Sequence, residues 1–366
     1  MENTLIKARW GNDSEDYNKI GITHEIKPWE DGIRTTGDSG TYEWWYFDAH
    51  LEDGSTLVIV FMTKPYISPE LPLTPQVNIV LDRPNGTKIN RLISLPAEEF
   101  EASTNNTNVR IGKNSFVGNL KHFDIHVEAE DIIADIRLDN IVPAWRPGSG
   151  YMYFGDQDEH YFAWLPSTPK GKVSGTITIN GTEENVSGIG YHDHNWGNIS
   201  MGKVMHHWYW GRAEIGEYTV VSSYIYSEKQ YGYHNFPIFM IAKGEQIIGD
   251  DPRYLKFTEK DEVIDEVTGK PYHKQTIYEY NNGSEHFVVT YTVEKAILQR
   301  KYIDEIPESQ REAAKGVGFD SAYLRFTGEV VLERYEEGKI IETIKSPALW
   351  EEMYFGETVL NANYKQ

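Results

Sequence analysis

The chain has 366 residues, a formal net charge of -21 and no cysteine. Its negative charge disfavours a phosphate backbone or an anionic membrane surface as a partner, so we expect no nucleic-acid binding and no stable membrane insertion. The absence of cysteine from the sequence excludes thiolate nucleophiles, disulfides and cysteine-ligated metal sites. The N-terminus has no basic region followed by an apolar one, and the apolar run at residues 56–62 is too short to span a bilayer. We therefore expect a soluble, cytoplasmic protein.

Short alternating or β-branched runs predict antiparallel strands along the chain. The clearest runs lie at residues 55–63, 172–179, 217–226, 286–293 and 325–335. Turn dipeptides that favour hairpins punctuate them, namely Asp53-Gly54, Asn85-Gly86, Asn180-Gly181, Asn282-Gly283 and Glu337-Gly338. Aromatic residues make up 13% of the chain, which suits β-structure around an aromatic interior. The predicted fold class is mostly β.

Two segments differ from this strand pattern. Residues 307–315 are expected to form a helix, because Pro307 stands at its start and Gly316 follows its end. Residues 143–164 are rich in glycine and aromatic side chains and too irregular for a strand, so we expect a loop or lid there.

An internal repeat indicates two domains, which is also what the length favours. WWYFDAHLEDGSTLVI from Trp44 aligns with WYWGRAEIGEYTVV from Trp208, and SGIGYHDHNWGN from Ser187 aligns with SPALWEEMYFGE from Ser346. Each half begins with an aromatic-rich hairpin and ends with an aromatic strand that closes on glycine. We therefore predict two antiparallel β-barrels that arose by internal duplication, one in residues 1–200 and one in residues 201–366.

The motif YHDHNW, residues 191–196, concentrates polar chemistry on one predicted strand. Alternation divides it into two faces, with His192, His194 and Trp196 on one and Tyr191, Asp193 and Asn195 on the other.

Three interpretations of YHDHNW are open. The two histidines could hold a divalent metal, with further ligands from His206, His207, His160 or Glu43. Alternatively, the imidazoles form a structural plug, satisfied by carboxylates and backbone groups. In the third interpretation the motif is the wall of a site, with Asp193 or a histidine as an acid or an orienting donor.

The motif YEWWYFD, residues 42–48, places a glutamate among aromatic side chains. If Glu43 is buried away from cations, its pKa is raised and it becomes a proton donor at neutral pH. If it pairs with Arg146 or Arg212, its role is structural. The counterpart motif HHWYWGR, residues 206–212, places Arg212 where the first half has Asp48, which would allow an ion pair.

Several catalytic motifs are absent from the sequence. It contains no G-x-S-x-G elbow, G-x-G-x-x-G loop, P-loop or H-E-x-x-H motif. Elbow-type hydrolase, dinucleotide, phosphoryl-transfer and zincin functions therefore have little support.

Taken together, YEWWYFD, GYHDHNWG, WYWGRA and ALWEEMYFG resemble the motifs of the tandem lipocalin-like family. This family includes carotenoid 1,2-hydratase (hydroxyneurosporene synthase), AttH-like proteins and decalin-forming Diels–Alderases. The resemblance implies two lipocalin-like (calycin-type) barrels with a hydrophobic pocket in or between them. It also implies a small hydrophobic substrate and no organic cofactor. No metal is predicted, and a monomer or homodimer is expected.

The resemblance implies a cyclase that folds a hydrophobic polyene of polyketide or isoprenoid origin, because the YHDHNW motif departs from the Trp-Phe-Asp-His pattern of the hydratases. Addition of water to a terminal alkene and non-catalytic binding are the alternatives. Hydration would need a proton donor and aromatic faces for a cation, whereas cycloaddition would need a fixed near-attack fold and a hydrogen-bond donor such as Asn195 or Tyr191. The candidate catalytic residues are Asp193, His194, His192 and Glu43. The candidate substrate-binding residues are Trp44, Tyr46, Tyr191, Asn195, Trp196, Trp208, Trp210 and Arg212.

Overall fold

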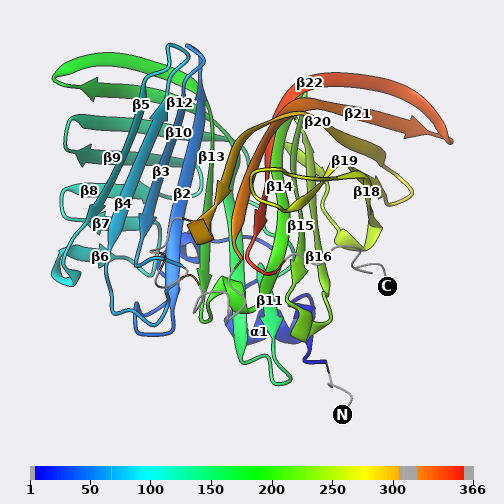
Figure 1. Cartoon of the computed structure of the whole chain (residues 1–366), viewed down its shortest axis with the longest axis horizontal. Coiled ribbons are helices and arrows are strands. Elements are labelled where there is room, and N and C mark those ends of the chain that lie inside the picture. Colours follow the sequence, from blue (N-terminus) through cyan, green and yellow to red (C-terminus); the bar gives the residue numbers. More distant parts are fainter. Residues whose placement is uncertain (1–4, 67, 305–307, 309–310, 312–319, 358–366) are drawn as a thin grey trace. The chain divides into compact units, whose positions relative to one another are not determined.

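The computed structural model describes residues 5–66, 68–304, 308, 311 and 320–357. The chain forms two compact units, whose elements are labelled in Figure 1. The N-terminal unit consists of residues 10–153 and 160–200. The C-terminal unit consists of residues 201–366 with residues 1–9 and 154–159, as far as these are described. The helix expected at residues 307–315 falls almost entirely outside the described residues.

In the N-terminal unit the first long strand of the sheet pairs with the last. The order along the antiparallel sheet is β5-β4-β3-β2-β13-β12-β10-β9-β8-β7-β6. The strands are β2 (Tyr42–Leu51), β3 (Thr56–Met62), β4 (Gln76–Asp82), β5 (Lys88–Ser94), β6 (Phe100–Ala102), β7 (Asn108–Ile111), β8 (Asn114–Gly118), β9 (His122–Ala129), β10 (Ile132–Val142), β12 (His160–Ile179) and β13 (Thr182–Gly197). Two short strands lie off this path, β1 (Ala8–Trp10) and β11 (Tyr151–Phe154), which pair with each other.

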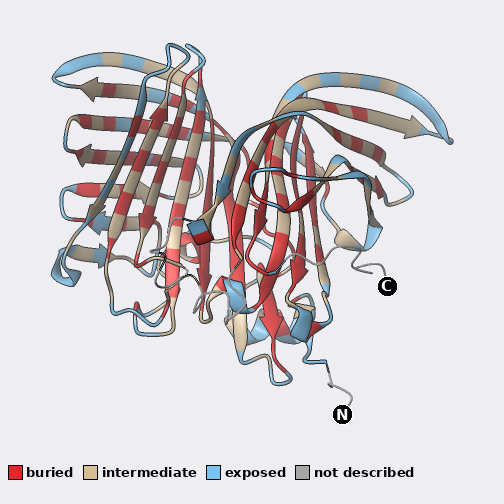
Figure 2. Ribbon diagram, viewed as in Figure 1, coloured by how far each residue is buried: buried red, intermediate tan, exposed pale blue. Residues whose placement is uncertain are grey.

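One apolar core fills the inner side of this sheet. Burial alternates along β2, β3 and β4, and Figure 2 shows the resulting bands of buried residues. The core joins Trp45 and Phe47 of β2 to Ile79 of β4 and, from the other arm of the sheet, to Ile125 of β9. Because both arms contribute to one cluster, the sheet curls around a single interior.

The C-terminal unit repeats this order of strands. Its antiparallel sheet runs β17-β16-β15-β14-β22-β21-β20-β19-β18, so again the first strand pairs with the last. The strands are β14 (Met205–Ile215), β15 (Tyr218–Ser227), β16 (Asn235–Lys243), β17 (Gln246–Gly249), β18 (Leu255–Ile264), β19 (Pro271–Asn281), β20 (His286–Lys301), β21 (Ala322–Glu336) and β22 (Lys339–Tyr354). Its core is richer in tyrosine and includes Tyr218, Tyr278 and Tyr291 beside Phe239 and Leu324.

The predicted hairpin turns are confirmed. Each of the turn dipeptides expected from the sequence joins two consecutive antiparallel strands. At the β12–β13 turn Asn180 and Gly181 have φ of 48° and 79°, and at the β21–β22 turn Glu337 and Gly338 have φ of 50° and 74°. Two successive positive φ values are what a tight hairpin turn of the type I′ class requires, and glycine adopts them without steric cost.

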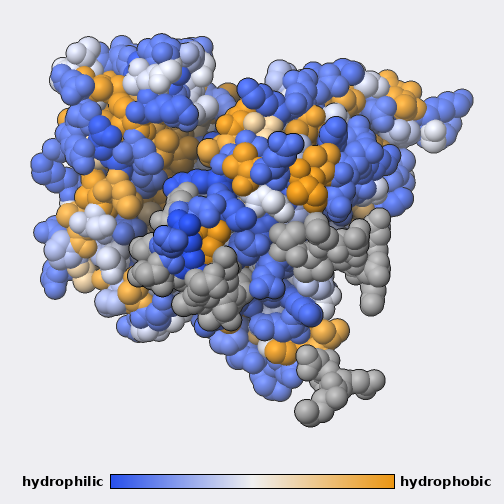
Figure 3. Space-filling model, viewed as in Figure 1, coloured by the Kyte–Doolittle hydropathy of each residue, from blue (hydrophilic) through white to orange (hydrophobic). Residues whose placement is uncertain are grey.

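The helical elements are short. Those with described bounds are α1 (Ser14–Ile20) and the 3-10 turns η1 (Pro28–Asp31), η2 (Ala97–Glu99), η3 (Met201–Lys203), η4 (Lys229–Tyr231), η5 (Pro252–Tyr254) and η6 (Tyr302–Asp304). None of the helices in the described part of the chain has the length and apolar character needed to cross a membrane. The face drawn in Figure 3 is mainly hydrophilic, with groups of apolar side chains between the polar ones.

Two expectations from the sequence are wrong. The segment 143–164 is not a continuous loop, because it contains β11 and the start of β12. The ungapped alignment of the two closing strands is also shifted relative to the pairing of the strands. Trp44 stands opposite Asn195 on β13, whereas Trp208 stands opposite Met353 on β22, one residue away from the counterpart that the alignment assigned.

Candidate functional site

The 3-10 turn η1 brings an aspartate into the interior of the N-terminal unit. Pro28 begins η1, where its fixed φ suits a helix and its missing N–H costs no hydrogen bond. Asp31 ends η1 and is fully buried. The indole N–H of Trp45 on β2 donates to the carbonyl oxygen of Asp31 at 3.0 Å. This bond holds Asp31 against the inner face of the sheet.

Asp31 forms a buried ion pair with His192. Burial raises the pKa of Asp31, but the charge and hydrogen bond of His192, with help from His194 and Ser167, outweigh it and hold the pKa below its ordinary value. The His192 Nδ1–H donates to the Tyr46 carbonyl oxygen at 2.8 Å, and Nε2 lies 3.2 Å from Asp31 Oδ2. Because an ionised carboxylate only accepts, Nε2 must donate as well, and the ring is an imidazolium.

Hydroxyl groups complete the partners of Asp31. Ser167 Oγ donates to Oδ1 at 2.6 Å, and Thr107 Oγ1 donates to Oδ2. Ser167 lies where the register of β12 against β13 shifts between Leu165 and Thr168. A bulge of this kind re-aims a side chain, and the prolines at 166 and 169 are residues that strands tolerate at bulges. Both carboxylate oxygens of Asp31 therefore have donors, as a buried charge requires.

His194 forms a second buried pair, with Glu43 on the neighbouring strand β2. Its Nε2 lies 2.7 Å from Glu43 Oε1, and both side chains are fully buried. The amide of Arg34 donates to Oε1 at 2.7 Å. Thr35 donates to Oε2 with its amide at 2.8 Å and with its hydroxyl at 2.7 Å. Surrounded by these donors, Glu43 is arranged to accept hydrogen bonds.

The alternative in which Glu43 pairs with Arg146 or Arg212 is therefore wrong. Backbone amides that follow η1 occupy the position of a cation beside this carboxylate, and amides leave no signal in the residue pattern. Arg146 instead lies 3.1 Å from Glu30, measured from Nε to Oε2.

Aromatic rings enclose both imidazoles. Trp45 stacks on His194 with ring centroids 4.6 Å apart, and Trp196 lies 4.6 Å from the same ring. Phe116 and Phe123 lie 4.6 Å and 4.5 Å from His192. These rings exclude water from the two pairs, which strengthens each pair and raises the cost of losing one partner.

The Asp31, His192, Glu43 and His194 network has the geometry expected of the structural plug. We call these four side chains the plug below. Among the residues that the structure describes, no group of three or more His, Cys, Asp or Glu side chains could hold a metal ion. The catalytic roles suggested for His192, His194 and Glu43 stay predictions.

Asp193 lies on the opposite face of β13, as strand alternation predicts. Its Oδ2 accepts hydrogen bonds from the Trp164 indole and the Tyr191 hydroxyl, both at 2.8 Å. Its Oδ1 accepts from the Asn195 amide at 2.6 Å. Burial raises the pKa of Asp193 to about 6, and these hydrogen bonds only partly oppose it. Tyr191 and Asn195, which we expected to donate to a substrate, here donate to Asp193.

Trp44 and Tyr46 lie on this same outer face of the sheet and are half-buried. Tyr46 stands directly opposite Asp193 in the pairing of β2 with β13. The ring of Trp44 packs against Tyr42, Tyr66 and Phe162. The structure thus brings several predicted site residues together around Asp193.

A pocket of about 210 Å³ is lined by Trp196, whose ring also packs against His194 of the plug. Its lining residues are Ile20, Ile22, Trp29, Glu30, Arg34, Arg146, Ser149, Tyr151, Leu165 and Trp196. Ligand pockets usually measure about 300–1,000 Å³, so this one has room for part of a long hydrophobic molecule. Of the predicted site residues, Trp196 is the one that lines it.

Two polar side chains of the pocket are held as hydrogen-bond donors. The Trp196 indole donates to the Tyr151 hydroxyl oxygen at 3.0 Å, and within the described residues the hydroxyl proton of Tyr151 has no acceptor. Burial raises the pKa of Tyr151 above its ordinary value, so the phenol stays neutral. The Arg34 guanidinium lies 4.8 Å above the Trp29 ring and donates to the carbonyls of Gly32 and Thr104.

Sequence reasoning missed most of this pocket. Arg146 and Tyr151 lie in the segment 143–164, which stood out for its composition, but we expected a loop there. No motif marked Arg34 or Asp31, because each reaches its position through η1 and the turn that follows it.

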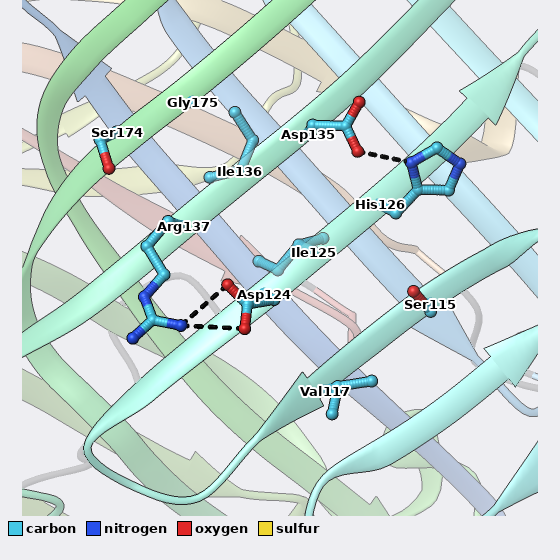
Figure 4. Close-up of a pocket in the computed structure, with 10 residues that line it drawn as sticks. All are labelled: Ser115, Val117, Asp124, Ile125, His126, Asp135, Ile136, Arg137, Ser174 and Gly175. Atoms are coloured by element: carbon cyan, nitrogen blue, oxygen red, sulfur yellow. Dashed lines mark hydrogen bonds and ion pairs between the residues drawn. The ribbon is translucent and has the colours of Figure 1, made fainter.

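A second depression, of about 290 Å³, lies on the outer side of β8, β9, β10 and β12 (Figure 4). Ion pairs cross it, with Arg137 Nη1 at 2.9 Å from Asp124 and His126 Nδ1 at 2.7 Å from Asp135. These side chains satisfy one another on an exposed strand surface. We therefore do not assign the ligand site to it.

The remaining predicted residues belong to the C-terminal unit. Trp208, Trp210 and Arg212 share one face of β14 and are half-buried. The Trp208 indole donates to Glu351 Oε1 at 3.4 Å, and its ring lies 5.0 Å from Phe355. Their roles in substrate binding stay predictions.

Comparison with known proteins identifies the family. A model of the Diels-Alderase-like family matches residues 32–266, which is more than half of the chain. The chain belongs to this Diels-Alderase-like family. The resemblance inferred from the four sequence motifs is thereby confirmed.

Relatives of this Diels-Alderase-like protein include named enzymes. Hydroxyneurosporene dehydrogenase of Chlorobaculum tepidum is 27% identical over 205 residues, which cover 48% of this chain and 54% of the relative, about half of each. The crystal structure of CghA with Sch210972 has a TM-score of 0.60 at 13% identity and covers 96% of this chain and 99% of its own. Kievitone hydratase of Nectria haematococca has a TM-score of 0.53 at 15% identity, over 96% of this chain and 98% of its own. At such identities the structural matches establish the fold.

Proposed function

We propose that this protein is a cofactor-independent cyclase that folds a hydrophobic polyene of polyketide or isoprenoid origin. The observation that carries the proposal is the aromatic pocket with the oriented donors Tyr151 and Arg34, in a chain of the Diels-Alderase-like family. A small hydrophobic substrate is its expected partner.

The pocket has what a cycloaddition needs. Such a reaction transfers no proton, so the protein contributes by holding diene and dienophile close together and by lowering the electron density of the dienophile. Trp29, Trp196 and Leu165 supply apolar walls, and the Tyr151 hydroxyl would donate to a carbonyl conjugated with the dienophile. Because Tyr151 already accepts from Trp196, its proton is directed to a different acceptor, and an oriented donor of this kind strengthens as charge develops.

We also propose that the two units are lipocalin-like barrels related by internal duplication, with residues 1–200 and 201–366 as the two domains. The support is the shared order of strands, in which a meander leads from the first strand to one edge and the last strand pairs with the first. Duplication explains this shared order of strands more simply than chance does.

Hydration of an alkene is the second candidate. Asp193 supports it, because burial raises the pKa of Asp193 to about 6 and brings the neutral acid within reach of mildly acidic conditions. Kievitone hydratase, which shares the fold, is named as a hydratase.

Incubation of purified protein with linear polyenes that carry a conjugated carbonyl tests these functions. A cyclase yields a product of unchanged mass with fewer conjugated double bonds, whereas a hydratase yields one heavier by a water. Liquid chromatography with mass and ultraviolet detection separates these outcomes. Saturable binding of every polyene without any product would refute both enzyme functions.

Substitution of Tyr151 tests the proposed donor. Tyr151→Phe removes one preorganised hydrogen bond to the developing charge, so we expect kcat to fall by about 10²-fold while substrate affinity changes little. Tyr335→Phe is the matched control, because Tyr335 donates to Glu333 at 3.1 Å in the C-terminal unit and does not line the pocket. If both variants cyclise at the wild-type rate, Tyr151 is not the donor.

A further inference from the structure

The inner face of β22 carries a buried acid that no function considered above uses. Glu352 is fully buried in the C-terminal unit, between Tyr209 of β14 and Leu324 of β21. Neither of its carboxyl oxygens has a hydrogen bond of acceptable geometry within the described residues. A buried polar group left unsatisfied costs about 1–3 kcal/mol, and such exceptions are frequent where a group serves catalysis.

Glu352 is held as a neutral acid. Burial raises the pKa of Glu352 well above its ordinary value, and the carboxylates of Glu259 and Glu262 reinforce this. The nearby hydroxyls of Tyr354 and Tyr209 oppose it without reversing it. Glu352 therefore keeps a proton that it can give away.

A row of titratable side chains runs from Glu352 towards the surface. The Tyr209 hydroxyl, close to Glu352, lies 2.9 Å from His273 Nδ1. His273 is itself partly exposed, and its Nε2 lies 4.0 Å from Glu262, an ion-pair distance that is too long for a hydrogen bond. Exposure rises along this path, because Glu352 and Tyr209 are buried whereas the side chains of His273 and Glu262 are 19% and 47% exposed. His273 can therefore exchange protons with solvent, and Tyr209 lies next to both His273 and the buried acid.

Aromatic rings surround the acid end of this path. Phe257 lies 5.7 Å from Tyr209, 4.0 Å from Tyr224 and 4.9 Å from Tyr278. Faces of aromatic rings stabilise a cation in a site without water. The titratable groups that act on Glu352 are Tyr209, Tyr354, Glu259 and Glu262, and those that act on Tyr209 include Tyr226 and His273.

We propose that Glu352, Tyr209 and His273 form an acid site in the C-terminal unit that protonates a hydrophobic ligand bearing an electron-rich carbon–carbon double bond. The π electrons of the ligand form a C–H bond as the O–H bond of Glu352 breaks, which leaves a carboxylate and a carbocation. The cation then loses a proton from an adjacent carbon to the Glu352 carboxylate. The net reaction is an isomerisation that consumes nothing, and Tyr209 with His273 exchanges the acid proton with solvent.

The protein alone tests the acid and its relay. The infrared spectrum at neutral pH is expected to show the carbonyl band of a buried protonated carboxyl group, which Glu352→Gln removes and Glu279→Gln leaves. Glu279 is the control, because it lies on β19 of the same unit and pairs with the half-exposed His286. In heavy water the band shifts on exchange, and Tyr209→Phe should keep the band but slow the shift. A missing band in the wild type, or unchanged exchange in Tyr209→Phe, would overturn the proposal.

Farnesol serves as a probe of proton delivery. In heavy water, wild-type protein should introduce deuterium at the carbons of its trisubstituted alkenes, measured by mass spectrometry. Glu352→Gln should reduce the rate by about 10²-fold, the usual contribution of a general acid, with Glu279→Gln again as the control. Deuterium no higher than in the Glu352→Gln sample would refute the site even if the infrared band is present. The result is independent of the cyclase pocket, since Tyr151→Phe should not affect it.

Discussion

The closing strands of the two units, β13 and β22, bury ionisable side chains in different ways. Opposite Trp45 on β2, the inner face of β13 carries His194, which pairs with the carboxylate of Glu43. Opposite Tyr209 on β14, the inner face of β22 carries Glu352, whose carboxyl oxygens have no hydrogen-bond partner among the described residues. One unit therefore buries charges as opposite pairs, and the other buries an acid that has kept its proton.

This difference determines which buried groups can change their protonation state. A paired imidazolium and carboxylate hold each other in place, and neither can change its charge without leaving the other unpaired. A lone neutral acid constrains little and can release its proton when a base or an electron-rich ligand arrives. On this argument the plug of the N-terminal unit is structural, whereas Glu352 in the interior of the C-terminal unit is free to take part in a proton transfer.

The outer faces of the same strands are more alike. Asp193 on β13 accepts from Trp164 and Tyr191, and Glu351 on β22 accepts from Trp208 and Tyr323. In the strand register Asp193 stands opposite Tyr46 and Glu351 stands opposite Trp210. A carboxylate held by an indole and a phenol is thus common to both units, whereas the inner faces differ.

The largest expected effect comes from breaking the plug. Asp31→Asn leaves the His192 imidazolium without its counter-charge, so at neutral pH the N-terminal unit should lose about 3–5 kcal/mol of unfolding free energy. The pKa of Asp31 lies below its ordinary value of 3.8, so its contribution is present above that pH and is lost as the pH falls through the folded value. Hydrogen exchange of the β2 and β13 amides reports this unit separately.

Asp124→Asn is the control for this experiment. Asp124 pairs with Arg137 at 2.9 Å on an exposed surface, where an ion pair contributes about 0–1 kcal/mol. Equal losses in the two variants would show that the plug does not carry the charge pair described here.

The second expected effect is a pH dependence of the unfolding free energy of the C-terminal unit that is opposite in sign to the one caused by Asp31. The folded pKa of Glu352 is raised above 4.5, so stability is greatest below that pH and falls by about 1.4 kcal/mol per pH unit until the folded value is passed. Glu352→Gln cannot ionise and should remove this slope above pH 4.5. Denaturation series across this range measure it, and an unchanged slope would mean that Glu352 is ionised in the folded protein.

Local geometry accounts for what the sequence predicted correctly. Alternation along a strand placed His192 and His194 on one face and Asp193 on the other, and turn dipeptides placed the hairpins, because both depend on a few neighbouring residues. Asp31 was not predicted as a partner of His192, since η1 lies far away in the chain and reaches β13 only through packing.

The register of the closing strands shows a limit of another kind. The alignment matched Glu352 with Asp193, whereas strand pairing places Glu352 opposite Tyr209 as His194 is opposite Trp45. A shift of one residue moves every side chain to the other face of a strand. The inward direction of Glu352, and with it the acid site, therefore could not be inferred from the aligned letters.

A smaller effect is expected on the outer face of β13. Trp164→Phe removes a donor from the Asp193 carboxylate, and a hydrogen bond to a charged group contributes about 1.5–3 kcal/mol. Since this bond lowers the pKa of Asp193, its loss should move that pKa further above 6. Nuclear magnetic resonance titration of the Asp193 carboxyl carbon measures the shift, and Trp145→Phe serves as the indole control because Trp145 contacts the Trp164 ring.

The smallest expected effect tests the likeness between the outer faces of β13 and β22. Tyr323→Phe removes the hydroxyl that donates to Glu351 at 2.5 Å, at a half-exposed position where Trp208 remains as a second donor. We expect a loss of about 0.5–1.5 kcal/mol in the unfolding free energy of the C-terminal unit, below that of Trp164→Phe in the N-terminal unit. The ratio of the two losses in unfolding free energy reports how far Glu351 and Asp193 are each shielded from water. A larger loss at Tyr323 would mean that Glu351, rather than Asp193, is the more deeply desolvated of the two.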